Sequence, residues 1–333
     1  MTFKLFALII AMVFIGIILL FGFLIYLRRP NYSTMKEAYH PFRSLDAKDR
    51  FLKYYDNRAT LWPVDSESKM VQTSYGKTFV RISGPKDAQS LVLLHGDTEN
   101  SISWLPQIET FSEKYRTYAI DNIFDNGRSI YSVPLESSND FVNWLHELFN
   151  ELNLGDTINL VGFSYGGWVA SSYALSYPNR LNKLILITPA GTVLSPRIEF
   201  LIRGMLTHFI PSRFSIESQL NWERVGLLEK GDAGRAVIDQ MVEELLLAKQ
   251  CFKQRGFVVP TVLSDKDWQN LKMPILFLVG EKEVLYSSQK AVQRLNMVVP
   301  QVQAEIVPNA SHDITHSQAE LTNKKIMDFL QSQ

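Results

Sequence analysis

The chain has 333 residues, of which 46% are hydrophobic, so it can bury one large core with an insertion. Its 34 basic and 34 acidic residues balance, which removes the electrostatic basis for a nucleic-acid partner. The lone cysteine, Cys251, excludes an internal disulfide framework and a cysteine-based zinc site, and its apolar helical surroundings favour a buried packing role.

An apolar run opens the chain and ends at a basic pair. Residues 5–27 read LFALIIAMVFIGIILLFGFLIYL, and Arg28-Arg29-Pro30 follow. About 20 apolar residues span a bilayer, so residues 1–30 are predicted to form an N-terminal transmembrane anchor. A cleaved signal peptide is the alternative, but its apolar region would be shorter, and no small-x-small cleavage site precedes the arginines.

Charges on either side of the apolar run indicate its orientation. Lys4 and the amino group precede it, and a larger basic set follows it: Arg28, Arg29, Lys36 and Arg43. Cytoplasmic flanks carry an excess of Lys and Arg. We therefore expect a single-pass membrane protein whose C-terminal part is cytoplasmic. Residues 31–68, which are polar with scattered aromatics, are expected to form a juxtamembrane connector that can dock on the following domain.

From residue 69 onward, strand-like and helix-like segments alternate, as in a mainly parallel sheet with helices on both faces. Met70–Tyr75 and Thr78–Ser83, joined at Gly76-Lys77, are expected to form an opening hairpin. Apolar positions from Phe141 to Leu152 recur at helical spacing, and Gly155 supplies the stop. Six continuous apolar runs read as buried parallel strands: Leu91–Leu94, Thr117–Ile120, Ile158–Phe163, Leu184–Ile187, Ile275–Val279 and Val302–Val307.

The sequence GFSYGG, residues 162–167, follows one of these strands and precedes a helix expected over Trp168–Ser176. G-x-S-x-G between a strand and a helix is typical of a sharp, strained turn that exposes a nucleophilic serine. The turn needs residues without bulk, and the glycines at 162, 166 and 167 meet that need. A glycine-rich turn with an incidental serine is the alternative, but the flanking strand and helix favour Ser164 as a nucleophile.

A serine hydroxyl is a weak nucleophile until a base takes its proton, and six histidines are available. His312 is the best candidate, because PNASHDI places it in a loop between the last strand and the last helix, at the carboxyl edge of the sheet. His316, four residues further on, is the alternative. Three others are expected to be structural or surface residues: His40, His146 and His208.

The imidazole in turn needs an acidic partner that fixes its tautomer and stabilises its charged form. Glu281 and Glu283 follow the strand that ends in LFLVG. Glu283, three positions beyond Gly280, has room to reach the histidine loop, whereas Glu281 is expected to face solvent or to cap the turn. The order Ser164, Glu283, His312 is then the serine, acid, histidine order of one hydrolase fold.

From about Met70 to its end, the chain resembles the α/β-hydrolase superfamily through LLHG, GFSYGG, LVGEKE and NASHD. The stretches LWPV, VRISGPKDAQSLVLLHG and VGEKEVLY resemble, more specifically, the bacterial carboxylesterases that cleave naproxen esters. Two differences are visible: the family acid is more often Asp than Glu at the position of Glu283, and Ser311 stands where glycine commonly precedes the histidine. The resemblance implies an α/β fold that needs neither a metal nor an organic cofactor.

The resemblance also implies an oxyanion hole made of backbone N–H groups. In the family, the segment after His95-Gly96 turns under the active site, so the donors here would be the N–H groups of Asp97 and Tyr165. His95 is then a scaffold residue. Because a carboxylate would repel the oxyanion, the side chain of Asp97 is expected to point away or to be neutralised.

Residues 191–264 interrupt the core and are too long to be a loop. Two amphipathic helices are indicated by helical spacing, one by Phe200, Leu201, Met205, Phe209 and Ile210 and one by Val237, Met241, Leu245 and Leu246. This segment is expected to form a helical cap over the nucleophile, and it divides the core into residues 69–190 and 265–333.

These features predict a membrane-anchored serine hydrolase that cleaves a small-molecule carboxylic ester through an acyl-enzyme on Ser164. Hydrolysis of thioesters or lipid esters, or acyl transfer, is one alternative, and the anchor would suit it by placing the cap near the bilayer. A catalytically silent binding protein on the same fold is another, because a fold does not fix a function. An intact set of serine, acid and histidine argues against the silent protein.

Overall fold

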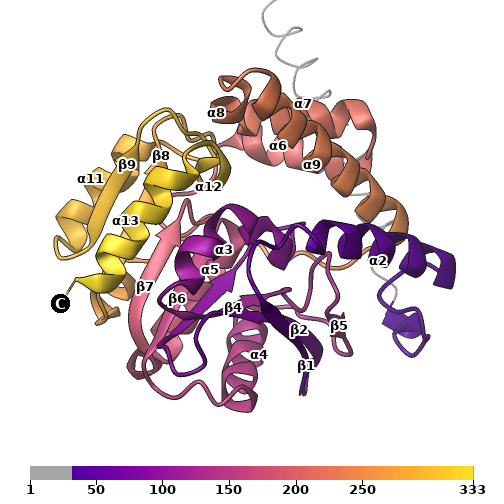
Figure 1. The fold of residues 1–333 in the computed structure, drawn as a ribbon. Helices are drawn as coiled ribbons and strands as arrows, with labels where there is room; N and C mark the ends of the chain where they lie inside the picture. The colour runs from indigo at the N-terminus through magenta and orange to yellow at the C-terminus, as the bar shows by residue number, and fades with distance from the viewer. Residues whose placement is uncertain (1–31, 333) are drawn as a thin grey trace, which may run out of the picture.

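The computed structural model describes residues 32–332. Within them a nine-stranded sheet has the order β1-β2-β4-β3-β6-β7-β8-β9, and β5 pairs with β2 (Figure 1). The pairs from β4 to β9 are parallel, and those that involve β2 are antiparallel. The strands are β1 Ser66–Thr73, β2 Gly76–Ser83, β3 Ser90–Leu94, β4 Arg116–Ile120, β5 Ile130–Tyr131, β6 Ile158–Phe163, β7 Leu181–Ile187, β8 Ile275–Gly280 and β9 Gln303–Val307.

Helices cover both faces of the sheet. The α-helices are α2 Leu45–Ala59, α3 Leu105–Ser112, α4 Ser138–Glu151, α5 Tyr165–Ser176, α6 Ile198–Phe209, α7 Arg213–Glu223, α8 Val225–Leu228, α9 Asp232–Cys251, α10 Asp265–Asn270, α11 Ser288–Val298, α12 Ile314–Ser317 and α13 Ala319–Gln331. Short 3₁₀ turns are η1 Tyr32–Thr34, η2 Ser101–Trp104 and η3 Pro178–Arg180. Residues of α4, α5 and α11 join one core cluster, and residues of α3 and α13 join the other.

The central strands explain why two cores form. In β3, Val92 and Leu94 lie in the cluster with α4 and α5, whereas Leu91 and Leu93 lie in the cluster with α3 and α13. All four are buried, because successive side chains of a strand point to opposite faces and both faces carry helices. The predicted mainly parallel α/β architecture is therefore confirmed.

The opening hairpin forms, but its turn lies two residues earlier than predicted. Thr73 pairs with Gly76, so the turn is Ser74-Tyr75 and not Gly76-Lys77. Gly76 is a strand residue at φ 135°, and any Cβ there would collide with the carbonyl oxygen of Ile130 in β5. Gly76 is therefore needed because β5 lies close to it, and not because it forms the turn.

Four helices, α6 to α9, lie together beyond the carboxyl ends of the parallel strands (Figure 1). That they act as the predicted cap stays a prediction. The two predicted amphipathic helices correspond to α6 and α9, whereas α7 and α8 were not foreseen. Helix α2 was not predicted either; it lies in the predicted connector and packs on α9 (Figure 1). Phe51 of α2 stacks edge-on against Phe252, with ring centroids 4.7 Å apart. The connector therefore docks on the cap, and Cys251 is buried beside it.

The predicted transmembrane anchor, residues 1–30, lies outside the described residues. Between residues 32 and 332, no helix combines the length and apolar character that crossing a bilayer requires. The anchor and its orientation therefore stay predictions, as do the exact limits of the domains.

Candidate active site

Ser164 occupies a strained turn between β6 and α5. Its backbone has φ 50° and ψ −115°, a combination that side-chain-bearing residues rarely adopt. Its N–H donates to the carbonyl oxygen of Ile187 in β7 at 2.9 Å, which fixes the turn to the sheet. A Cβ on Gly166 would lie against the carbonyl oxygens of Leu94 and His95, so only glycine lets α5 approach β3 this closely. The predicted strand–turn–helix context is present.

Three side chains from separate loops form a continuous chain of hydrogen bonds. His312 Nε2 lies 2.9 Å from Ser164 Oγ, and His312 Nδ1 lies 3.0 Å from Glu283 Oε2. Ser164 follows β6, Glu283 follows β8 and His312 follows β9, so all three lie at the carboxyl edge of the parallel strands. The structure brings together the three residues that the sequence singled out.

The carboxylate of Glu283 is held from both sides. Its side chain has no exposed surface. Oε1 accepts hydrogen bonds from the N–H groups of Val284 and Leu285 at 2.8 and 2.9 Å, and Oε2 faces His312. With one oxygen fixed by the backbone, the other has a single orientation, and it fixes the ring of His312 in turn.

The electrostatic surroundings of His312 favour its protonated form. Burial on its own lowers the pKa of His312, but the charge of Glu283 and its hydrogen bond outweigh burial and raise the pKa above its ordinary value. Arg224 lowers this pKa and Glu223 raises it, with smaller effects. The site therefore stabilises an imidazolium, the species that a proton transfer from Ser164 to His312 would create.

Glu281, the alternative acid, lies in a different environment. It is exposed, and its Oε2 accepts a hydrogen bond from the N–H of Asn309 at 3.0 Å. Asn309 begins the loop that carries His312, so Glu281 caps a turn of that loop, as expected.

The other histidines have partners away from Ser164. His316 Nδ1 lies 3.1 Å from Thr315 Oγ1, and burial lowers the pKa of His316 to about 4. His95 is buried and its Nε2 accepts from the N–H of Asn122 at 2.9 Å, as a scaffold residue would. His40 forms a hydrogen bond with the carbonyl oxygen of Tyr131, and His208 forms one with Gln254. His146 stacks on the ring of Tyr177.

The expected oxyanion donors are Asp97, just beyond β3, and Tyr165, the first residue of α5. Among residues 32–332, no acceptor lies within hydrogen-bonding reach of either backbone N–H. The N–H of Tyr165 also belongs to the positive end of the α5 dipole. Both donors are therefore available to a negatively charged oxygen beside Ser164.

The carboxylate of Asp97 is neutralised, as its proximity to the oxyanion donors requires. Arg255 Nη2 lies 2.7 Å from Asp97 Oδ1 and 2.9 Å from Asp125 Oδ1. Asp125 Oδ2 in turn accepts from the N–H of Thr98 at 3.2 Å. Arg255 comes from the segment that follows α9, so one guanidinium ties the end of the cap to the loop that carries Asp97.

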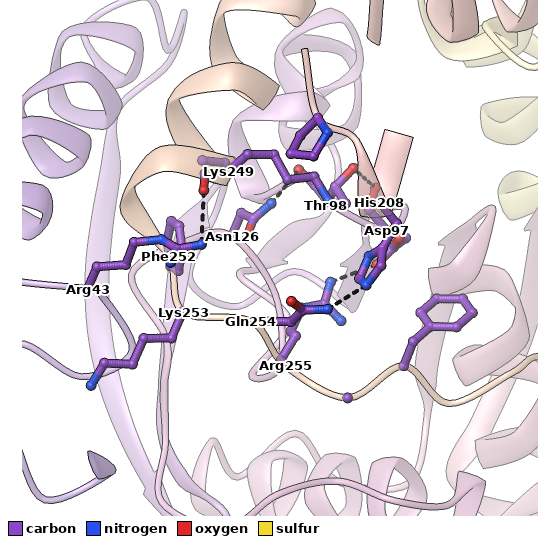
Figure 2. Close-up of a pocket in the computed structure, with 14 residues that line it drawn as sticks. Arg43, Asp97, Thr98, Asn126, His208, Lys249, Phe252, Lys253, Gln254 and Arg255 are labelled. Atoms are coloured by element: carbon purple, nitrogen blue, oxygen red, sulfur yellow. Dashed lines mark hydrogen bonds and ion pairs between the residues drawn. The ribbon is translucent and has the colours of Figure 1, made fainter. Parts of the chain in front are cut away.

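A pocket of about 120 Å³ lies between this loop and the cap (Figure 2). Asp97 and Thr98 line it from the core, and His208, Lys249 and Phe257 line it from the cap. The ring of Phe257 packs on that of Tyr165, with centroids 5.5 Å apart. The pocket therefore reaches the loop of Asp97, whereas Ser164, Glu283 and His312 are not among the residues that line it.

The end of α7 bonds to the backbone of the His312 loop, a contact that the sequence did not reveal. The N–H of His312 donates to the carbonyl oxygen of Glu223 at 3.2 Å, and Arg224 Nη1 donates to the carbonyl oxygen of His312 at 2.7 Å. Leu227 N–H donates to Asp313 Oδ2 at 2.6 Å. These residues thus hold the loop in place, and each of the three bonds has a backbone atom on at least one side, which leaves no pattern in the sequence.

The part of the chain from 32 to 332 contains no cluster of three or more His, Cys, Asp or Glu side chains that could hold a metal ion. The expectation that the reaction needs no metal or organic cofactor continues to rest on the sequence.

Residues 91–324 match the family model described as the alpha/beta hydrolase family. Two relatives come from Bacillus subtilis. The carboxylesterase YbfK is 34% identical over 295 residues, which cover 87% of this chain and 96% of the relative. The uncharacterized carboxylesterase nap is 31% identical over 299 residues, which cover 85% of this chain and 93% of the relative.

Solved structures agree with these relatives. The crystal structure of naproxen esterase from B. subtilis superposes with a TM-score of 0.78 at 30% identity, over 86% of this chain and 99% of that one. The crystal structure of the carboxylesterase CesB (YbfK) gives a TM-score of 0.76 at 32% identity, over the same shares. The similarity therefore extends over nearly the whole length of both proteins.

Proposed function

The chain belongs to the alpha/beta hydrolase family, and we propose that it hydrolyses carboxylic esters with Ser164 as the nucleophile. The observation that carries the proposal is the hydrogen-bonded series Ser164, His312, Glu283, in which a weak nucleophile meets a base with a fixed orientation. The carboxylesterases among its relatives support the same reaction.

In the proposed reaction, Ser164 Oγ attacks the ester carbonyl carbon while its proton moves to His312 Nε2. The N–H groups of Asp97 and Tyr165 donate to the oxyanion that develops on the carbonyl oxygen. His312 then gives the proton to the departing alcohol, which leaves an acyl group on Ser164. Water, activated by the same imidazole, attacks this acyl-enzyme and releases the carboxylic acid.

A fluorophosphonate probe tests this proposal directly. Such a probe phosphonylates only a serine that a neighbouring base activates, so we expect covalent labelling of the native protein, mapped by mass spectrometry to the peptide with Ser164. Heat-denatured protein serves as the control and should stay unlabelled. A native protein that resists labelling and turns over no short-chain ester would be a silent binding protein on this fold.

We also propose that residues 191–264 act as a cap that shapes the substrate pocket. The support comes from the lining of the pocket, where His208, Lys249, Arg255 and Phe257 all belong to this segment (Figure 2). The core parts, residues 69–190 and 265–333, would then supply the reacting groups, and the cap would supply most of the specificity.

Arg255 is expected to influence the reaction through Asp97. Replacing it in Arg255→Met leaves the carboxylate of Asp97 uncompensated beside the oxyanion donors, which should lower kcat by about 10-fold or more with little change in KM. Arg255→Lys keeps a positive charge and should recover part of the loss. Steady-state kinetics on a soluble ester measure both changes.

The matched control for Arg255 is Arg180. The side chain of Arg180 is buried to the same extent as that of Arg255 and pairs with Asp156 at 2.8 Å. However, Arg180 lies in η3, which precedes β7, so it is at the end of the sheet opposite to Ser164. Arg180→Met should keep normal kcat. Equal losses in Arg180→Met and Arg255→Met would mean that the loss reflects stability and not the oxyanion loop.

We further propose that residues 5–27 anchor the chain in a membrane as a single span. The full chain should then float with phosphatidylcholine vesicles in a density gradient after a wash in high salt. A chain that begins at Asn31 should remain in the dense fractions and keep its esterase activity. Flotation of both chains, or of neither, would contradict the anchor.

A further inference from the structure

Helix α6 carries a row of uncovered apolar side chains. Six large residues of α6 and the segment after it, which we term the α6 face, are between 42% and 83% exposed: Ile198, Leu201, Ile202, Leu206, Ile210 and Phe214. Within the helix they recur at intervals of one turn, so they share one side. A contiguous apolar surface of this kind marks a place of contact with another apolar phase.

The opposite side of α6 already has its packing partners. Phe200 packs on Trp222 of α7, with ring centroids 6.4 Å apart. Phe209, three residues after Leu206 on the side of the exposed row, is buried at the end of the helix. Burial against the rest of the cap therefore explains only part of the apolar content of α6. The exposed side needs a second partner.

That partner is apolar and does not require charge. The carboxylate and the guanidinium of α6, Glu199 and Arg203, neutralise each other in an ion pair of 3.1 Å, and His208 in the last turn lines the pocket. The guanidinium of Arg203 also lies over the ring of Trp222. The α6 face thus has no net charge that would select an acidic or basic macromolecule.

The described chain begins near the C-terminal end of α6. The hydroxyl oxygen of Tyr32 accepts from the N–H of Gly256 at 3.1 Å. Gly256 lines the same pocket as His208 of α6 and Pro211, which follows α6. Residues 28–31 can bridge at most about 18 Å between the apolar run and Tyr32, even when fully extended. A bilayer that holds residues 5–27 would therefore lie close to the cap.

We propose that the α6 face inserts into the surface of the bilayer in which residues 5–27 are anchored, and that the cap thereby receives esters dissolved in that bilayer. The proposal rests on the proposed anchor, and it goes further because it assigns a second, independent membrane contact to the cap. Since the face carries no net charge, uncharged phosphatidylcholine should suffice, and salt should have little effect.

A depth measurement tests the contact. The full chain is prepared as Leu206→Cys and, separately, as Met297→Cys, and each is labelled with the fluorophore NBD in phosphatidylcholine nanodiscs. Met297 is the matched control, because it is apolar and 70% exposed on α11, away from the cap. Cys251 is buried and should not react.

We expect lipids with a nitroxide on the acyl chain to quench the label at position 206 at least twofold more than the label at 297. Equal quenching in protein that still floats with vesicles would overturn the α6 contact and leave the anchor intact. Loss of flotation would overturn the anchor and this proposal together. In a third outcome, the label at position 206 is shielded but is not quenched by the lipid nitroxide, and the shielding increases with the number of chains per disc. That result would assign the α6 face to a second copy of the chain and would overturn the bilayer contact.

A kinetic measurement tests the consequence for the substrate. The double variant Ile202→Ser/Leu206→Ser should keep normal kcat/KM on a soluble short-chain ester and lose about 10-fold or more on a long-chain ester embedded in vesicles. Met297→Ser should be normal on both. If the double variant loses both activities equally, a thermal melt should show a folding defect. If it loses neither activity, the delivery of substrate from the bilayer is overturned.

Discussion

Ser164→Ala is expected to abolish ester hydrolysis, with a loss of at least about 10⁴-fold in kcat on a short-chain ester. The change removes the atom that would form the acyl-enzyme, and among residues 32–332 no other side chain bonds to His312 Nε2. Alanine carries the same Cβ as serine at this strained φ, and the N–H bond to Ile187 stays. The variant should therefore fold normally, as a thermal melt would check.

The matched control is Ser172→Ala in α5, the helix that follows Ser164. Ser172 is also half-buried, and its hydroxyl donates to the carbonyl oxygen of Trp168 at 3.0 Å, which is a local bond within α5. This variant should keep full activity. A Ser164→Ala protein that still turns over ester at a rate near the native one, free of contaminating esterase, would refute a covalent role for Ser164.

Glu283→Gln is expected to lower kcat by at least about 100-fold. Oε1 of Glu283 accepts from two backbone N–H groups, so the oxygen of a glutamine must take that place and its NH₂ group must face His312 Nδ1. Nδ1 then has to accept, which puts the ring proton of the neutral imidazole on Nε2. That tautomer cannot take the proton from Ser164.

The pH profile distinguishes this effect from a structural one. The native base works only above the pKa of His312, which Glu283 raises. Without that charge the pKa falls, although Arg224 and Glu223 still act on it in opposite directions. The acidic limb of the rate profile of Glu283→Gln should therefore move to lower pH while the plateau falls.

Glu281→Gln provides the comparison for the acid. Its carboxylate is exposed and bonds only the N–H of Asn309 among the described residues, which a glutamine oxygen can also accept. We expect near-native kcat and an unchanged pH profile. If Glu281→Gln has the strongly reduced kcat and Glu283→Gln is nearly normal, the acid has been misassigned, although the assignments of Ser164 and His312 would be unaffected.

The positions of Ser164, Glu283 and His312 could be predicted because each follows a short apolar strand. Parallel strands bring their carboxyl ends to one edge, so three loops that are far apart in sequence meet there without any further information. The glycines around Ser164 are needed because β6, α5 and β3 pack closely there, so they mark this close packing in the sequence. This part of the site depends on local patterns and on one rule of topology.

Arg255 and Arg224 could not be predicted, because their partners are set by how the cap lies on the core. Asp97 and Arg255 are 158 positions apart. LLHG precedes Asp97, but no motif flanks Arg255. Helix α2 was missed for a related reason: its buried residues are only Ala47, Phe51 and Tyr55, a stripe too narrow to stand out. The N-cap residue Ser44 was the one visible signal.

The bonds from α7 and α8 to the His312 loop bear on how this enzyme can be engineered. Cap exchange between homologous proteins assumes that the cap is a separable module. Such an exchange is then expected to change the selectivity and to leave the chemistry unchanged. Here the carbonyl oxygen of Glu223 and the guanidinium of Arg224 bond to the backbone of His312, the proposed general base. A chimaera that imports a foreign segment for residues 191–264 would therefore need the matching loop 309–313 as well, and the two should be transplanted as one unit.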